Sequence, residues 1–172
     1  MSTWRSELRE PQMRIAITGH TNLTDATIRM VASAVTDYLQ KFAPTELIGI
    51  SCLASGADAL FARVVLDLGG LLEVVLPSAA YRQTVVHPEF AAEFDDLLAS
   101  AANVRVVPLP VADREAFEAA NNELIDTCDQ LIAVWDGMPS QNRGCTATVV
   151  AGARARGLGV TVIWPPGAVR CS

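Results

Sequence analysis

Short apolar runs alternate along the chain with longer segments in which apolar residues recur at helical spacing. The expected strands cover residues 14–18, 46–53, 71–76, 104–107, 130–135 and 160–164. The expected helices cover residues 24–42, 57–68, 88–101, 113–128 and 144–156. Short apolar runs flanked by Gly and Pro are typical of buried strands, whereas helical spacing predicts a helix with one buried face.

Particular residues predict where the helices begin. Thr24 or Asn22 is placed to cap the first helix, and Asp113 to cap a later one. Such side chains accept hydrogen bonds from the free N–H groups at a helix start. Pro88 stands at a first helical position, where proline loses no helical bond. Residues 78–88 have no regular pattern and are expected to form a long connection.

The alternation of strand and helix is typical of a parallel sheet with helices on both faces. Continuous apolar strands fit this arrangement, because both faces of each strand are then covered. The sequence therefore predicts an α/β fold, a three-layer Rossmann-like domain over residues 13–172 with a mostly parallel six-stranded sheet. Residues 1–12 are polar, lack the apolar core of a secretion signal, and are expected to form an N-terminal extension.

The composition of the chain indicates which classes of binding partner and which location to expect. The chain is 51% apolar and 19% charged, which argues against disorder. Its net charge of −6 argues against nucleic acid as a partner, because nucleic-acid surfaces are usually basic, but it leaves room for a local phosphate pocket. No apolar run is long enough to span a membrane. The four cysteines form no Cys-x-x-Cys pair, so we expect no metal site and a reducing, cytoplasmic location.

Ligands of open parallel sheets bind beyond the carboxyl ends of the strands, where the strand order reverses. Two loops expected at this edge carry candidate ligand-binding residues: Gly19, His20 and Thr21 after the first strand, and Ser55, Gly56 and Asp58 after the second. Glycine allows close approach of the backbone, and N–H groups at a helix start attract anions. A tight turn and a capped helix are the alternative interpretations of these two loops.

The loop after the fifth strand predicts a phosphate site most strongly. It contains Asp136 and Gly137, followed by Arg143, Gly144, Cys145 and Thr146 at the start of a helix. A small-residue turn, a hydroxyl group and a guanidinium are the components of a phosphate cradle. Tyr81 and Arg82, in the connection after the third strand, are expected to cover the ligand or, equally, to form a surface loop.

Four sequence segments together resemble the SLOG superfamily, which groups DNA-processing protein A (Smf) with the Lonely Guy phosphoribohydrolases. These segments are Ile17-Thr18-Gly19-His20, Ser55-Gly56-Ala57-Asp58-Ala59, residues 128–137 (CDQLIAVWDG) and Gly144-Cys145-Thr146-Ala147. The resemblance spans about residues 14–164. It implies a Rossmann-like domain that binds nucleotides or their derivatives, with phosphate at residues 143–146. Relatives that carry molybdenum cofactor share similar turns, so a pterin-type ligand is also open.

The chain departs from the phosphoribohydrolase motif Pro-Gly-Gly-x-Gly-Thr-x-x-Glu. Cys145 replaces the glycine before Thr146, and Val149 stands at the position of the catalytic glutamate. Valine cannot act as a general acid or base. The leading hypothesis is therefore a protein that binds or senses a nucleotide-derived small molecule, with no catalytic residue assigned. The alternative is an N-glycoside hydrolase of nucleoside monophosphates, in which Asp58, Asp136 or His20 replaces the missing glutamate.

The resemblance also bears on assembly. Relatives often dimerise through helices beside the site, so we expect a homodimer in which the apolar segment 61–68 supplies the interface. No further cofactor is predicted beyond a nucleotide or phosphate ligand.

Overall fold

The computed structural model describes residues 11–139 and 145–172. The elements follow in this order: β1 (Met13–Gly19), α1 (Asp25–Leu39), β2 (Leu47–Ser51), α2 (Ala57–Asp67), β3 (Leu71–Leu76), α3 (Tyr81–Thr84), α4 (Pro88–Ala99), β4 (Asn103–Val106), α5 (Arg114–Thr127), β5 (Gln130–Val134), α6 (Thr146–Ala155) and β6 (Gly159–Ile163). The strand and helix pattern of the sequence is thus confirmed over these residues.

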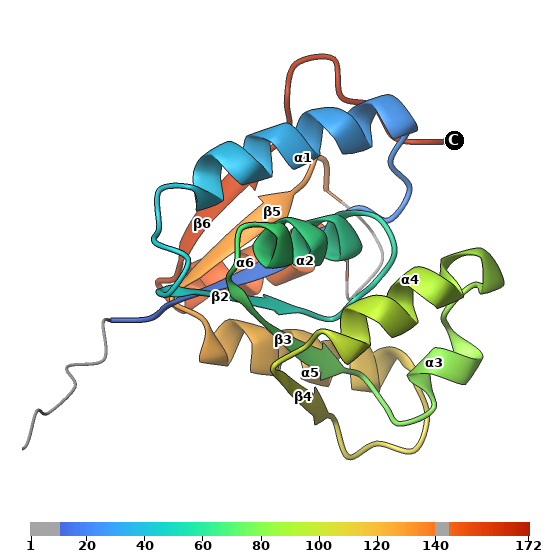
Figure 1. Cartoon of the computed structure of the whole chain (residues 1–172). Helices are drawn as coiled ribbons and strands as arrows, with labels where there is room; N and C mark the ends of the chain where they lie inside the picture. Colours follow the sequence, from blue (N-terminus) through green and yellow to red (C-terminus); the bar gives the residue numbers. More distant parts are fainter. Residues whose placement is uncertain (1–10, 140–144) are drawn as a thin grey trace, which may run out of the picture.

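The strands form one sheet in the order β4-β3-β2-β1-β5-β6, and every neighbouring pair is parallel. From β1 the chain builds outward through β2, β3 and β4, then crosses to the other side of β1 for β5 and β6 (Figure 1). The strand order therefore reverses between β1 and β5, which pair from Ile15↔Gln130 to Gly19↔Val134. In open α/β sheets such a switch point is the usual place for a ligand.

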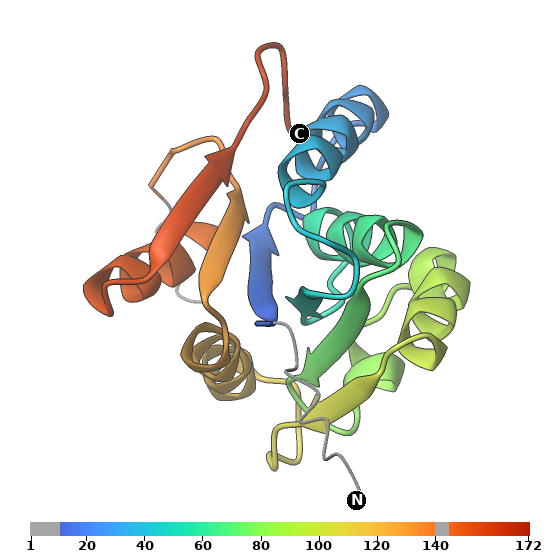
Figure 2. The same cartoon turned by 60° about the vertical axis from the view of Figure 1, so that its left-hand side comes forward.

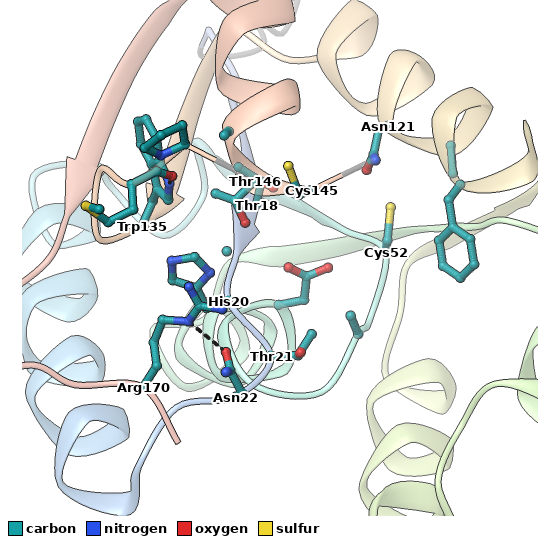
Figure 3. Close-up of a pocket in the computed structure, with 18 of the residues that line it drawn as sticks. Thr18, His20, Thr21, Asn22, Cys52, Asn121, Trp135, Cys145, Thr146 and Arg170 are labelled. Atoms are coloured by element: carbon teal, nitrogen blue, oxygen red, sulfur yellow. Dashed lines mark hydrogen bonds between the residues drawn. The ribbon is translucent and has the colours of Figure 1, made fainter. Parts of the chain in front are cut away.

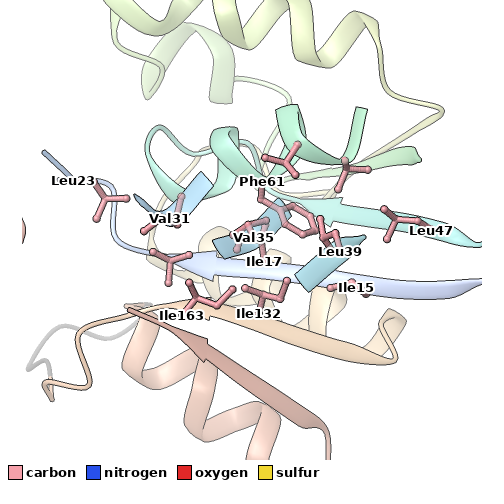
Figure 4. Packing of buried hydrophobic residues seen from close by; sticks show 14 residues of the cluster. Ile15, Ile17, Leu23, Val31, Val35, Leu39, Leu47, Phe61, Ile132 and Ile163 are labelled. Atoms are coloured by element: carbon pink, nitrogen blue, oxygen red, sulfur yellow. The ribbon is translucent and has the colours of Figure 1, made fainter. Parts of the chain in front are cut away.

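Helices cover both faces of the sheet, which confirms the three-layer Rossmann-like fold (Figure 2). Side chains of α1 and α2 pack on one face against Ile15 and Ile17 of β1 (Figure 4). Ala16, between these two residues, points to the opposite face and joins the cluster under α5 and α6. The alternation follows from the strand geometry, in which successive side chains point to opposite faces. α4 extends the first layer over β3.

Three helices begin with a side-chain cap. Thr24 accepts from the N–H of Thr27 at 3.2 Å, and Asp113 accepts from Ala116 at 3.0 Å. His87 caps α4 by accepting from Glu89 N–H at 3.3 Å, with Pro88 at the first position. Of the two candidates for capping α1, Thr24 is confirmed. By contrast, α2 and α6 begin without a side-chain cap.

Two expectations about the fold need correction. The connection after β3 contains the short helix α3, which was missed because four residues show no helical period. The apolar segment 61–68 is not a free interface: Phe61, Val64 and Val65 of α2 are buried inside the chain. The homodimer itself stays a prediction. The expected extension over residues 1–12 lies almost wholly outside the described residues.

Among the described residues, no helix is both long and apolar enough to cross a bilayer.

Candidate functional site

A pocket of about 350 Å³ opens at the carboxyl ends of β1 and β5, where the strand order reverses. This volume lies in the range of small-molecule sites, about 300–1,000 Å³. The pocket gathers residues from loops far apart in the sequence (Figure 3). Its lining comprises Thr18, Gly19, His20, Thr21, Asn22, Cys52, Ala54, Asp58, Tyr81, Phe117, Ala120, Asn121, Trp135, Met138, Pro139, Cys145, Thr146, Ala147 and Arg170.

The floor of the pocket depends on two glycines. A Cβ atom on Gly19 would collide with Ala57 of α2 and lie 2.8 Å from the Cβ of Val134. Gly56 has a φ of +83°, and a Cβ there would lie 2.7 Å from the carbonyl oxygen of His20. The loop after β1 and the start of α2 can therefore touch only because both positions lack a side chain.

That contact also satisfies the start of α2. The N–H of Ala57 donates to the carbonyl of His20 at 3.2 Å, and the N–H of Ala59 donates to Ala54 at 3.1 Å. Ser55 and Gly56 do not line the pocket. Ser55 and Gly56 thus lie behind the pocket wall, whereas Ala54 and Asp58 line it, and the expectation that this helix start receives an anion gains no support from these contacts.

His20 and Asp136 meet where β1 and β5 end. Nε2 of His20 lies 3.2 Å from Oδ1 of Asp136 and accepts the backbone N–H of Asp136 at 3.3 Å. The imidazole stands edge-on to Trp164, with ring centroids 5.6 Å apart. Burial lowers the pKa of His20, and the nearby Arg170 lowers it further, although Asp136 acts in the opposite sense. The ring is therefore mainly neutral at pH 7.

Asp136 carries the charge of this pair. Burial would raise its pKa, but hydrogen bonds from Met138 N–H and Arg170, together with the contact with His20, lower the pKa below its usual value. Met138 N–H donates to Oδ1 at 3.0 Å, and Arg170 Nη1 donates to Oδ2 at 3.2 Å. Asp136 is therefore an ionised anchor that does not itself line the pocket but holds the guanidinium of Arg170 beside it.

Asp58 has the opposite electrostatic behaviour. Its side chain lines the pocket, but only 8% of the residue is exposed. Burial raises its pKa to about 7, although backbone N–H groups of Ala54 and Cys52 donate to the carboxylate. Near neutral pH this group therefore exists in both the acid and the carboxylate form. A carboxyl group with such a pKa in a pocket is able to act as a proton donor.

The start of α6 forms the opposite wall. Cys145 is the N-cap residue, and Thr146 and Ala147 follow in the first turn; all three line the pocket. The backbone N–H groups of Thr148 and Val149 bond to the Cys145 carbonyl. Among the described residues, those of Thr146 and Ala147 have no hydrogen-bond partner. Free N–H groups at a helix start, together with the helix dipole, favour an anion.

Some of the other candidate residues from the sequence line the pocket, and others do not. Tyr81 lines the pocket, where its ring packs against Phe94 and Phe117. Arg82, its neighbour, does not: its guanidinium is exposed and forms an ion pair with Asp95 at 2.6 Å. Gly137, at a φ of +79°, allows the turn after Asp136 but does not line the pocket. Arg143 and Gly144 lie outside the described residues.

Asn22, Asn121 and Arg170 are among the lining residues that were not sequence candidates. Asn121 lies on α5 and resembles an ordinary surface residue in the sequence, because neither spacing nor motif marks it. Arg170 belongs to a segment after the last strand, and only tertiary contacts bring it back to β1. No local pattern identifies such a residue.

The comparisons with known proteins show the fold of this chain but no relative by sequence. No family model matches the sequence, and no curated protein does. Solved structures match well. DNA processing protein A from Streptococcus pneumoniae aligns with a TM-score of 0.66 and 17% identity over 91% of this chain. The molybdenum cofactor carrier protein from Chlamydomonas reinhardtii aligns at 0.56 and 16% over 88% of this chain and 76% of its own. The chain therefore shares the Rossmann-like fold of these proteins.

A further structural match corrects one expectation. DNA processing protein A from Helicobacter pylori, described for its single-stranded DNA binding mode, aligns with a TM-score of 0.65 and 14% identity. The alignment covers 96% of this chain and 72% of that one. The argument from net charge against nucleic acid was therefore wrong, because a protein with this fold binds single-stranded DNA. Total charge says little about one local surface.

Two observations restrict the comparison of this chain with these proteins. The chain spans about half (52%) of the Streptococcus pneumoniae protein, so the rest of that protein has no counterpart in the alignment. Val149, at the position of the phosphoribohydrolase glutamate, is buried in the core cluster under α5 and α6 and does not line the pocket. Any acid–base chemistry would have to come from another side chain.

Proposed function

We propose that this protein binds a nucleotide or nucleotide-derived small molecule, with the ligand's phosphate at the start of α6. The main observation is that Thr146 and Ala147 line the pocket at the switch point and that their N–H groups have no partner among the described residues. Thr18 and His20 line the same pocket and supply a hydroxyl and a ring nitrogen. These groups are neutral donors, which suits an anion that must be held without burying an unpaired charge.

The other end of the pocket suits a flat heterocycle. Tyr81, Phe117 and Ala120 supply apolar surface there, and Asp58 and Asn121 supply polar groups. An amide and a carboxyl group are able to pair with the donors and acceptors on the edge of a base. The combination supports a phosphate joined to a nitrogen heterocycle.

Thr146→Pro tests the phosphate position directly. Cys145 has an extended backbone (φ −80°, ψ 168°), which tolerates a following proline, and proline suits the first helical position. The variant should therefore fold but lack both the amide N–H and the hydroxyl group. We expect its affinity for AMP, measured by calorimetry, to fall by roughly 10- to 100-fold, as for loss of a charge-assisted hydrogen bond.

Thr146→Ala is the matched control. It removes only the hydroxyl group and keeps the N–H, so its loss of affinity should be smaller than that of Thr146→Pro. Equal affinities of wild type and both variants would contradict the proposed position. The same titration with a pterin and with a single-stranded oligonucleotide compares AMP with the ligand classes of the structural neighbours.

A second function is favoured by Asp58. A buried carboxyl group with a pKa of about 7 is able to protonate a leaving base, which is the step that Val149 cannot perform. The protein would then hydrolyse the N-glycosidic bond of a nucleoside monophosphate. Incubation with a panel of nucleotides should release free base, and Asp58→Asn should abolish the release. No free base from any nucleotide would leave binding as the function.

A further inference from the structure

The segment that follows β6 returns to the mouth of the pocket and is fastened there. Val169 exchanges two hydrogen bonds with the hydroxyl group of Thr27, both at 2.8 Å. Cys171 N–H donates to the carbonyl of Asn22 at 2.7 Å, and Arg170 forms an antiparallel bridge with Leu23. These contacts join the segment to the loop between β1 and α1, so its middle residue, Arg170, has a defined position.

The guanidinium of Arg170 has partners but is not saturated. Its Nε donates to Oδ1 of Asn22 at 3.1 Å (Figure 3). Its Nη1 donates to Asp136 at 3.2 Å. A guanidinium has five N–H donors, and those of Nη2 have no partner among the described residues. The side chain is 42% exposed and lines the pocket. It therefore has donors left for a ligand.

Arg170 is also the only permanent cation in the described lining of the pocket. An anion held by the N–H groups of α6 would enter a space with one acid at the rim, Asp136, and one half-neutral acid, Asp58. Asp136 would keep the N–H of Met138 and the contact with His20 if its ion pair with Arg170 were released. The pair is thus able to separate without leaving Asp136 unpaired.

We infer that Arg170 holds the anionic end of the ligand, and that ligand binding transfers its guanidinium from Asp136 to the ligand's phosphate. The inference rests on the proposed function and makes the segment after β6 a part of the binding site. A guanidinium matches the geometry of a phosphate with two parallel hydrogen bonds, so it selects a phosphate over a neutral group. Asp136 keeps the guanidinium in place while the pocket is empty.

The experiment compares variants at Arg170 and Asp136 in calorimetric titrations with AMP and with inorganic phosphate. Arg170→Ala should weaken AMP binding by about 10- to 100-fold, the scale of a lost charge-assisted hydrogen bond, and Arg170→Lys should weaken it less. Arg82→Ala is the control, because this exposed guanidinium pairs with Asp95 away from the pocket. Its affinity should equal that of the wild type.

Asp136→Asn separates ligand binding from a merely structural role. If Arg170 only fastens the segment through Asp136, both Asp136→Asn and Arg170→Ala should weaken binding alike. If Arg170 moves to the phosphate, Asp136→Asn should bind AMP at least as tightly as the wild type, because it removes the competing partner. Equal losses in these two variants would overturn the inference.

The two proposals fail in different ways. Wild-type protein that binds AMP, with Arg170→Ala binding equally well, would overturn the role of Arg170 and leave the proposed function intact. Wild-type protein that binds neither AMP nor inorganic phosphate would overturn both. Arg170→Lys serves as a second variant should Arg170→Ala fail to fold.

Discussion

Asp58 lies in the first turn of α2, where a carboxylate normally gains from the helix dipole, yet its pKa is raised to about 7. The cause is burial: desolvation of the charged form outweighs two backbone hydrogen bonds. Nearby Cys52 and Tyr81 offer no positive charge to compensate, and burial raises the pKa of both. A group kept half-neutral beside a pocket is more useful for recognition or proton transfer than for stability.

The first prediction concerns stability and pH. Because the folded pKa of Asp58 exceeds the unfolded value of 3.8, the folded state holds an extra proton between about pH 4 and pH 7. Asp58 therefore contributes most to the free energy of unfolding below pH 4. This contribution declines as the pH rises to 7 and does not change further above pH 7. Urea unfolding should show a wild-type loss of a few kcal/mol across this range that Asp58→Asn lacks. Parallel curves for the two proteins would contradict the raised pKa.

The second prediction concerns anion binding and pH. Sulfate keeps a constant charge between pH 6 and pH 8, so any change in its affinity reports on the protein. As pH falls, Asp58 loses its negative charge near pH 7, and His20 gains a positive charge at lower pH, because its pKa is lowered. Asp136, the carboxylate beside His20, keeps its charge in this range, because its pKa is lowered.

Sulfate should therefore bind more tightly at pH 6 than at pH 8, as measured by its effect on the thermal unfolding midpoint. Asp58→Asn should remove most of this dependence, and His20→Gln should remove part of the remainder. A pH-independent affinity in the wild type would mean that the anion sits away from both groups.

At the scale of elements, the contact between the β1–α1 loop and the start of α2 depends on backbone approach. Gly56→Ala would place a methyl group 2.7 Å from the carbonyl oxygen of His20, at a φ of +83° that side chains rarely adopt. We expect a loss of about 1–3 kcal/mol in the free energy of unfolding, together with weaker AMP binding. Thermal or urea unfolding and calorimetry measure the two effects.

Gly157→Ala is the control for Gly56→Ala. Gly157 also has a positive φ of +72°, but a Cβ there meets nothing within 4 Å, and it lies at the end of α6, outside the pocket lining. The Gly157→Ala variant should lose some stability through backbone strain but keep its affinity for AMP. Equal binding by the two variants would show that the close approach at Gly56 does not support the pocket.

The elements themselves were largely predictable, because their signals are local. Apolar runs identify the strands, and Thr24, Pro88 and Asp113 mark helix starts that the structure confirms. α3 was not predicted, because a single turn has no period.

The site was predicted only in part. His20, Asp58 and Thr146 follow from loops at strand ends, whereas Arg170 depends on a tertiary contact with Asn22 that sequence spacing does not encode.

At the scale of the whole molecule, the switch point explains why residues far apart in the sequence share one pocket. β1 and β5 diverge into helices on opposite faces, so their carboxyl ends leave a gap that α6 and the segment after β6 border. The segment after β6 is fastened to the β1–α1 loop and to α1, whereas the start of α6 lies across the pocket on the other face of the sheet. A ligand that touches both walls links parts of the molecule that are otherwise joined only through the core.

This linkage gives the last prediction. Ligand present at about 100 times its Kd should stabilise the folded state by about 2.7 kcal/mol. Because the ligand bridges separate pieces, protection in hydrogen exchange should appear together at residues 18–24, 145–149 and 168–171 when AMP is added. Residues 82–99, which include the exposed pair of Arg82 and Asp95, should not change. Protection confined to α3 and α4 would place the ligand on another surface. Protection at residues 145–149 without protection at 168–171 would confirm the phosphate position and exclude a contact between Arg170 and the ligand. The two walls are fastened independently of each other, so they respond together only when one ligand contacts both.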